Sequence, residues 1–229
     1  MGELENAVCD ATNSLLSSKG RIKLLEAGCG SSTHIKFIPE VYAIGIDISE
    51  QQLEKNKIVQ EKILGDIQEY PLPKDEFDVA ICWMVLEHLS NPQNAMRNMF
   101  GAVKAQGLVI LGFPNLLSIK GIVTKFTPFW FHQLFYKFMK YEFQPFPTYF
   151  RVAITPNKVM KFAEENGFSV VFIKFVEGGV TKKFRNRFRI MDFAFVIIER
   201  VTKFVSSGKM LSPLLDSCAI VLQKRGIRS

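Results

Sequence analysis

Residues 24–33, LLEAGCGSST, combine the end of an apolar run, one acid and a pair of glycines. The apolar run that ends at Leu25 predicts a short buried strand. Gly28 and Gly30 mark a sharp backbone turn, because glycine adopts conformations that other residues avoid. The Ser and Thr residues that follow are good N-caps, so the sequence predicts a helix over 32–38. A strand, a glycine-rich turn and a helix N-terminus in succession can hold a ligand against backbone N–H groups.

Apolar runs alternate with helical patterns along most of the chain. Strands are expected at residues 22–26, 41–46, 62–65, 77–82, 107–113, 168–176 and 218–225. Helices are expected at residues 3–18, 32–38, 49–59, 91–104 and 155–167. Apolar strands that alternate with helices indicate an α/β fold, doubly wound around a mostly parallel seven-stranded sheet.

Acids stand where three of the expected strands end: Glu26, Asp47 and Asp66. Ligands of an open parallel sheet bind beyond the carboxyl ends of its strands, so these acids are expected to face one crevice. A phosphate group would be repelled by three carboxylates. A cationic ligand that carries ribose hydroxyls and an adenine ring would fit the same crevice.

The motifs LLEAGCGSS, AIGIDIS and GDIQEYPLPKDEFDVAICWMVLEHL follow one another within residues 20–113. This region resembles the class I S-adenosylmethionine-dependent methyltransferases, specifically the small type 11 branch. The resemblance implies a Rossmann-like fold, S-adenosyl-L-methionine as the cofactor, S-adenosyl-L-homocysteine as its product, and no metal. It also implies one domain over 1–229, in which 20–113 bind the cofactor while 114–152 and 180–207 form insertions on the acceptor side.

The same resemblance assigns roles at the first glycine-rich turn. Glu26 occupies the position of the acid that contacts the amine region of the methionine moiety. Gly28, Cys29 and Gly30 occupy the turn whose backbone approaches the methionine and the ribose. Ser32 stands where the family often has a third glycine, so altered packing is expected there.

The later motifs carry further roles by resemblance. Asp47 matches the acid that binds both ribose hydroxyls, and Ile48 matches the apolar neighbour that packs on adenine. Asp66 matches the acid near the exocyclic amine of adenine, and Ile67 would offer its backbone N–H to the ring. Trp83 matches the residue at the end of the fourth strand that lines the cofactor and the acceptor.

The chain offers two histidines as general bases, which are needed only where the acceptor must lose a proton. His88 belongs to the Glu-His pair of VLEHL and is the first candidate, because a neutral imidazole suits that task near pH 7. His132, inside the aromatic segment, is the second candidate. A structural hydrogen bond at a helix start is the competing interpretation of His88.

A dinucleotide-dependent oxidoreductase is the rival interpretation of the glycine-rich turn. The sequence fingerprint of these enzymes needs a third glycine, but Thr33 stands at that position. Asp66 would also add unfavourable negative charge. A binding protein that keeps the fold without catalysis is a further alternative, since fold alone does not establish function.

Charge divides the chain into two unequal halves. Residues 1–110 hold 10 Lys/Arg and 15 Asp/Glu, whereas residues 111–229 hold 19 and 7. Only 3 of the 21 phenylalanines precede residue 111. The aromatic, lysine-containing segment 115–150 therefore suggests an acceptor lid after the fifth strand, with a hydrophobic small molecule as the partner. Docking on an anionic membrane and a simple extra core layer are the alternatives.

The basic run 182–189 offers RNA or protein as an alternative methyl acceptor, although no appended RNA-binding module is recognisable. No apolar stretch reaches the roughly 18–20 residues that a membrane span needs. The four cysteines are scattered, and the N-terminus is acidic and polar, so a cytoplasmic location, with peripheral membrane contact as an option, is expected. The oligomeric state is left open.

Overall fold

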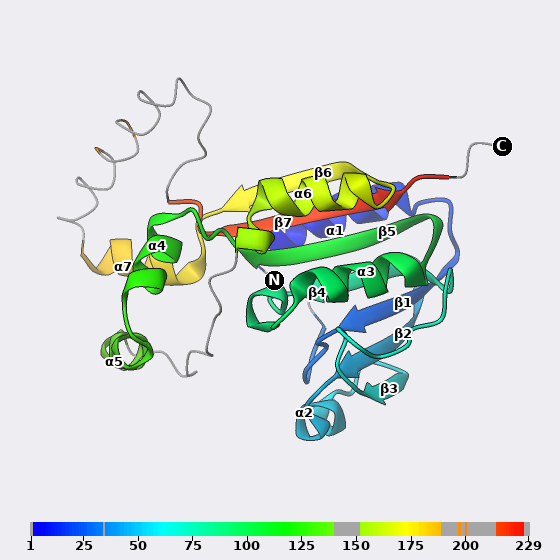
Figure 1. The fold of residues 1–229 in the computed structure, drawn as a ribbon, viewed down its shortest axis with the longest axis horizontal. Coiled ribbons are helices and arrows are strands. Elements are labelled where there is room, and N and C mark those ends of the chain that lie inside the picture. The colour runs from blue at the N-terminus through cyan, green and yellow to red at the C-terminus, as the bar shows by residue number, and fades with distance from the viewer. Residues whose placement is uncertain are drawn as a thin grey trace.

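Figure 1 shows the computed structural model, which describes residues 2–33, 35–139, 152–188, 197, 200 and 214–226. Within these residues, seven strands form one sheet in the order β3-β2-β1-β4-β5-β7-β6. The strands are β1 (Arg21–Ala27), β2 (Glu40–Asp47), β3 (Glu61–Leu64), β4 (Phe77–Trp83), β5 (Val103–Pro114), β6 (Phe168–Val176) and β7 (Ser217–Lys224). All seven coincide with strands expected from the sequence.

The sheet is mostly parallel, as the sequence predicts. Strands β1 to β5 pair in parallel, and β7 runs antiparallel between β5 and β6. The chain leaves β1 toward β2 and β3 on one side and returns to β4 and β5 on the other. The strand order therefore reverses between β1 and β4, and the carboxyl ends of these strands form the expected ligand-binding edge.

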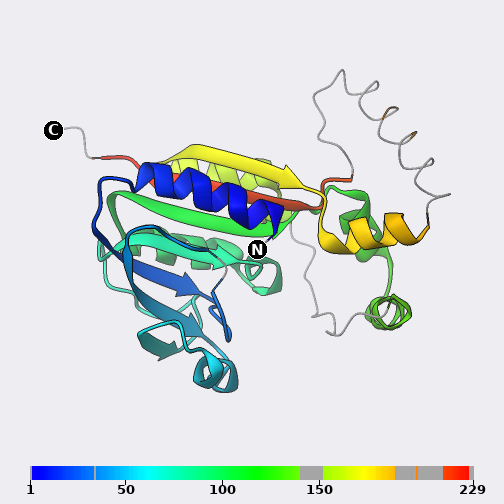
Figure 2. The same ribbon diagram turned by 180° about the vertical axis from the view of Figure 1, so that it is seen from behind.

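Helices cover both faces of the sheet (Figures 1 and 2). The helices are α1 (Glu3–Leu15), α2 (Glu50–Lys55), α3 (Pro92–Ala102), α4 (Ile119–Phe126), α5 (Phe129–Phe138), α6 (Pro156–Glu165) and α7 (Gly179–Arg187), with short 3-10 turns η1 (Leu86–His88) and η2 (Val152–Ile154). α3 and α6 pack on one face, and α1 packs on the other. Each face thus has its own buried cluster, which makes the fold the doubly wound α/β type.

Two corrections to the expected helices concern the ligand-binding edge. The predicted helix over 32–38 does not form in its described residues, which follow turns and irregular backbone. The side chain of Asn13 on α1 accepts from the Ile38 amide at 2.7 Å and donates to the Lys36 carbonyl at 3.2 Å. These tertiary hydrogen bonds replace the ones a helix would supply. The helix begun by Ser49 ends at Lys55, well before residue 59.

Three helices, α4, α5 and α7, lie together beyond the carboxyl ends of the strands, and we call them the outer helices (Figures 1 and 2). α4 and α5 follow β5, which confirms a helical, aromatic-rich insertion at that point. Its remainder at residues 140–151, and the part of the expected insertion 180–207 that follows residue 188, fall outside the described residues apart from isolated positions. No helix in the described part of the chain is long and apolar enough to cross a membrane.

A buried acid at the start of β7 joins the outer helices to the sheet. Asp216 is almost fully buried, and its carboxylate accepts from Thr181 Oγ1 of α7 at 2.6 Å and from the Gly178 amide. Lys120 of α4 lies 3.3 Å from the same carboxylate. The backbone carbonyl of Asp216 also accepts from the Asn115 amide at 2.9 Å. One side chain therefore tethers α4 and α7 to a common point.

Candidate active site

The glycine-rich turn after β1 folds over the end of β2. The amides of Gly28 and Cys29 both donate to the Ile46 carbonyl, at 2.8 Å and 3.2 Å. Gly28 and Gly30 have positive φ angles of 68° and 50°, in the left-handed region that favours glycine. A Cβ on Gly28 would lie 2.4 Å from Val85 Cγ2, whereas a Cβ on Gly30 would meet nothing within 4 Å. The turn is therefore closed at its first glycine and open at its second.

Asp47 lies at this open side with a fixed orientation. Its Oδ2 accepts from the Gly30 amide at 2.8 Å, and its Oδ1 accepts from the Ser49 amide at 2.8 Å. Because an ionised carboxylate has about four acceptor positions, both oxygens keep lone pairs for a ligand's hydroxyls. The next residue, Ile48, is 76% exposed and presents an apolar side chain at the same edge.

The turn has a support that the sequence did not predict. Asn56, directly after α2, is almost fully buried, and its amide group donates to the carbonyls of Cys29 and Gly30 at 3.4 Å and 3.1 Å. Its Oδ1 accepts from the amides of Ile58 and Val59. Asn56 is thus a positioning residue for the turn, and its only sequence signal is an Asn at the point where the helical pattern weakens.

Glu26 and Cys29 are both buried at the end of β1. Glu26 stands opposite Gly45 on β2 and Ile81 on β4. Burial, together with the charges of Glu26 and Asp47, raises the pKa of the Cys29 thiol to about 12. The Sγ atom of Cys29 packs against Gly45, where an added Cβ would lie only 2.6 Å from it. Cys29 therefore contributes its backbone to the turn and its thiol to the core.

Asp66 opens a turn that is attached to α3. Its carboxylate accepts from the backbone amide of Gln68 at 2.9 Å and from the side chain of the same residue. Asn98 of α3 donates to the Ile67 carbonyl at 2.8 Å. The side chain of Ile67 is buried in the core, so any contact of this residue with a ligand would have to come from its backbone.

Trp83 ends β4 within the core. It is 5% exposed, and its ring occupies the space beside Gly112, where an added Cβ would lie 2.4 Å from a ring carbon. The structure thus gives Trp83 a packing role between β4 and β5. Its expected role as a lining residue for cofactor and acceptor stays a prediction.

The structure separates the two candidate bases. His88 lies in η1 beside the glycine-rich turn, because Val85 of the same segment packs on Gly28. Its ring is partly exposed, and Nε2 lies 4.0 Å from Oε1 of Glu87. His132 lies on α5 among the outer helices, and its Nε2 is 3.0 Å from the hydroxyl oxygen of Thr127. Val85 thus places the segment of His88 next to the turn, whereas the ring of His132 contacts the hydroxyl and the carbonyl of Thr127, between α4 and α5.

Glu87 is the buried acid next to His88. It is 5% exposed, and its Oε2 has no hydrogen-bond partner among the described residues. Burial raises the pKa of this carboxyl to about 7, while its own backbone and the charge of Lys120 act in the opposite direction. Glu87 was not singled out as a site residue from sequence, because the VLEHL pattern does not reveal that this side chain points inward.

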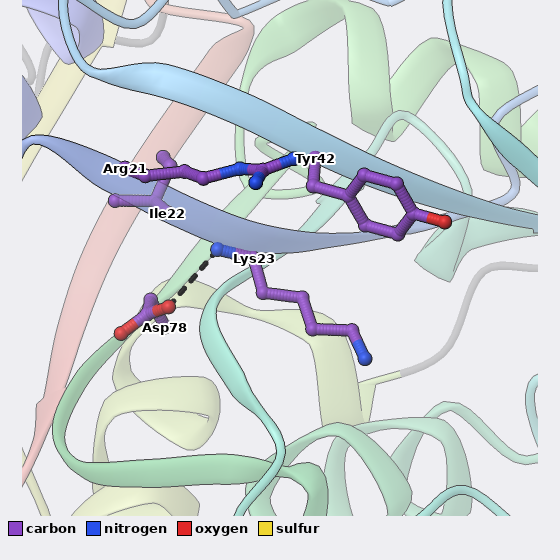
Figure 3. Close-up of a pocket in the computed structure, with 5 residues that line it drawn as sticks. All are labelled: Arg21, Ile22, Lys23, Tyr42 and Asp78. Atoms are coloured by element: carbon purple, nitrogen blue, oxygen red, sulfur yellow. Dashed lines mark hydrogen bonds between the residues drawn. The ribbon is translucent and has the colours of Figure 1, made fainter.

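A second hollow lies at the opposite, amino-terminal edge of the sheet (Figure 3). Arg21, Lys23, Tyr42 and Asp78 line it from the starts of β1, β2 and β4. Burial raises the pKa of Asp78, but hydrogen bonds from Lys19, the Lys23 amide and Lys104 hold it below its ordinary value. Arg21, Lys23 and Tyr42 contact the neighbouring acids Glu40, Glu76 and Glu61 in turn, so structural ion pairs and hydrogen bonds account for the polar residues of the hollow.

The carboxyl-end site fits S-adenosyl-L-methionine by the chemistry of its residues. An oriented acid with free lone pairs suits ribose hydroxyls, an exposed Ile suits an adenine face, and the open Gly30 turn leaves room for the methionine moiety. In the described residues, no group of three or more His, Cys, Asp or Glu side chains could hold a metal ion.

Residues 25–111 match the family described as "Methyltransferase domain". An uncharacterized methyltransferase of Schizosaccharomyces pombe is 31% identical over 114 residues, which cover 42% of this chain and 41% of the yeast protein. A probable S-adenosylmethionine-dependent methyltransferase of Mycolicibacterium smegmatis is 28% identical over 46% of this chain and 44% of its own length. The matches thus span less than half the length of these curated relatives.

Solved structures share the fold over nearly the whole chain. An S-adenosylmethionine-dependent methyltransferase from Mesorhizobium loti covers 97% of this chain and 99% of its own, with a TM-score of 0.60 at 12% identity. The [4+2]-cyclase SpnF covers 96% of this chain and 81% of its own, with a TM-score of 0.57 at 13% identity. At these identities the likeness concerns the fold alone, and the fold accommodates more than one chemistry.

Proposed function

We propose that this chain is an S-adenosylmethionine-dependent methyltransferase, which the match of residues 25–111 to the family described as "Methyltransferase domain" supports. We further propose that it methylates an oxygen or nitrogen atom of a hydrophobic or aromatic small molecule or lipid-like acceptor. The observation that carries the cofactor part is the fixed carboxylate of Asp47 beside the open Gly30 turn. In this proposal Asp47 binds both ribose hydroxyls, Ile48 packs on adenine, and Glu26 lies near the methionine amine.

The residues at this edge orient the reaction partners. S-adenosyl-L-methionine supplies an activated methyl group, so the chain has mainly to align the acceptor and exclude water. Asn56 keeps the glycine-rich turn in place, and Val85 closes one side of it. His88, on the same segment as Val85, is the proposed general base where the acceptor carries a proton to be removed; His132 is the second proposal.

The proposal of a hydrophobic acceptor is supported by the position and composition of the outer helices. They lie beyond the same strand ends as the cofactor site, and α4 and α5 carry many apolar and aromatic side chains (Figure 1). An apolar surface beside the site favours a hydrophobic acceptor over a polar metabolite. Peripheral contact with an anionic membrane would give access to a lipid-like acceptor.

RNA or protein is the second candidate acceptor. A relative from Arabidopsis thaliana, a tRNA (carboxymethyluridine(34)-5-O)-methyltransferase, is 29% identical over 46% of this chain and 27% of its own length. The basic helix α7 supports this alternative by composition. Against it, Lys182 pairs with Glu3 at 3.2 Å and Arg185 pairs with Glu177 at 2.9 Å, so part of the positive charge is used within the chain.

The experiment has a binding stage and a labelling stage. Isothermal titration with S-adenosyl-L-homocysteine compares the wild type with Asp47→Ala, which should lose affinity by more than about tenfold, since a charge-assisted hydrogen bond contributes roughly 1.5–3 kcal/mol. Unchanged affinity would remove Asp47 from the cofactor site. Ile38→Ser, at an exposed position before β2 on the opposite edge, is the matched control.

Methyl-labelled S-adenosyl-L-methionine is then supplied with a cell extract, which is separated into organic, aqueous small-molecule and macromolecular fractions. Label in the organic fraction that disappears with Asp47→Ala supports the hydrophobic acceptor. Label in RNA or protein would replace it with the second candidate. Intact cofactor binding without any transferred label would favour a non-catalytic binding protein of the same fold.

A further inference from the structure

We propose that the outward faces of α4 and α5 form a docking surface for an anionic lipid membrane. This inference rests on the proposed function, because the membrane would deliver a lipid-like acceptor to the site. The surface consists of apolar side chains that the fold leaves uncovered, and we call it the outward stripe. Its members are Ile122, Val123, Phe126, Trp130, Phe131, Leu134 and Phe138.

The stripe follows helical spacing. On α5, Trp130, Leu134 and Phe138 are four residues apart, and on α4, Ile122 and Phe126 have the same spacing. Residues four apart lie on one face of a helix, so each helix presents a continuous apolar row. Phe126 is 75% exposed and Trp130 is 62% exposed, which is far outside the behaviour of core residues.

The side of α5 next to the stripe packs against α7, and this packing does not explain why Trp130 and Leu134 are exposed. Phe135, on the inner side, lies 5.8 Å from the ring of Phe184 on α7. Met139, just after the helix, is almost fully buried. Phe138, at the end of the stripe, also lies 6.4 Å from the ring of Phe188. Within the described residues, the packing of α5 therefore involves Phe135, Phe138 and Met139, whereas Trp130 and Leu134 keep more than half of their surface exposed. Exposed apolar patches of this kind mark surfaces that bind a partner or a membrane.

The charge of the outer helices indicates which partner the outward stripe would bind. The outer helices contain seven Lys and Arg residues and no Asp or Glu. Among the described residues, acids from elsewhere pair with Lys120, Lys182 and Arg185, and these three acids are fewer than the seven cations of the outer helices. Lys137 lies within the apolar rows on α5. Aromatic side chains with interspersed cations are typical of helices that lie in an anionic lipid interface.

A second copy of the chain is the competing occupant. Self-association through this face would bring two sets of cations together, and like charges oppose that contact. An anionic bilayer offers both the apolar layer and the opposite charge. The surface also lies beyond the carboxyl ends of the strands, on the side of the sheet edge that holds the proposed cofactor site (Figure 2).

The protein carries its own probe for the test. Of its two tryptophans, Trp83 is 5% exposed and Trp130 is 62% exposed, so a change in fluorescence on docking reports Trp130. Full-length protein is mixed with vesicles that contain about one-third phosphatidylglycerol in phosphatidylcholine, or phosphatidylcholine alone, at ~0.05 M and ~0.5 M NaCl. We expect a blue shift and flotation with the anionic vesicles at low salt, both reduced at high salt.

The variant Phe126→Ser with Leu134→Ser keeps Trp130 and removes two exposed apolar side chains, so its folding should be little affected. It should bind anionic vesicles at least about tenfold more weakly. Ile38→Ser, which replaces an apolar residue 85% exposed at the opposite edge, should bind like the wild type.

Three results would overturn the docking surface: no flotation at low salt, equal binding of the double variant, or equal binding to neutral vesicles. A dimer in sedimentation that the double variant dissociates would reassign the stripe to a second copy. Titration with S-adenosyl-L-homocysteine, run in parallel, separates the two proposals. Intact cofactor binding without flotation would refute only the membrane-docking proposal. Flotation without cofactor binding would refute only the proposed function.

Discussion

Replacing Glu87 with Gln should stabilise the protein at neutral and higher pH but not in acid. The Glu87 side chain is buried, and burial raises the pKa of its carboxyl from 4.5 to about 7. The folded protein therefore keeps a proton that the unfolded chain releases. Stability contributed by this proton is present below about pH 4.5 and is lost as the pH rises toward 7.

The size of the effect follows from the shift. Each pKa unit corresponds to about 1.4 kcal/mol, so the carboxyl should cost the folded state roughly 3 kcal/mol once the pH exceeds 7. Gln has nearly the same shape and never ionises. The difference in unfolding free energy between Glu87→Gln and the wild type should therefore grow by about this amount from acid to neutral pH.

Urea unfolding of both proteins over roughly pH 3 to pH 9 measures this difference. Glu76→Gln serves as a control of opposite sign, because the hydrogen bond from Lys23 lowers the pKa of Glu76. That variant should lose stability at neutral pH, and the loss should shrink as the pH falls through the pKa of Glu76. If the Glu87→Gln difference stayed constant across the range, the reasoning from burial would be refuted.

Three further substitutions test the glycine-rich turn. Gly28→Ala should lower the unfolding free energy by about 1–3 kcal/mol, because a Cβ there meets Val85 and the φ angle is positive. Gly30→Ala, whose Cβ would lie in open space, should lower the unfolding free energy less in urea experiments. It should nevertheless reduce the affinity for S-adenosyl-L-homocysteine measured by titration. Asn56→Asp keeps the size but removes both donors to the turn, so unfolding should become easier by about 2 kcal/mol and cofactor affinity should fall. Unchanged affinity in Asn56→Asp would mean that the turn holds its shape without this side chain.

The sheet could be predicted from sequence because its signals are local. Each strand is an apolar run, and the acids Glu26, Asp47 and Asp66 stand where parallel strands end. The ligand-binding edge follows from such a pattern. Asp47 ends β2 and Ile48 follows it, so the structure places both residues at this edge. Their roles in binding the cofactor stay predictions.

The errors arise where long-range contacts outweigh local preference. The helix over 32–38 fails because Asn13, distant in sequence, supplies hydrogen bonds to that segment. α2 stops early because the side chain of Asn56 bonds to the glycine-rich turn. The inward orientation of Glu87 and the packing of Trp83 on Gly112 likewise depend on neighbours that no sequence window contains.

Because Asp216 bonds to both α4 and α7, the two insertions that contain these helices should be exchanged between relatives only together. α4 follows β5 and α7 follows β6, yet Lys120 and Thr181 meet on the same carboxylate. A graft that changes acceptor preference by transplanting only one of these insertions would leave that buried charge without half of its partners. Recombination between relatives should therefore succeed only when both insertions and the first residues of β7 are inherited together.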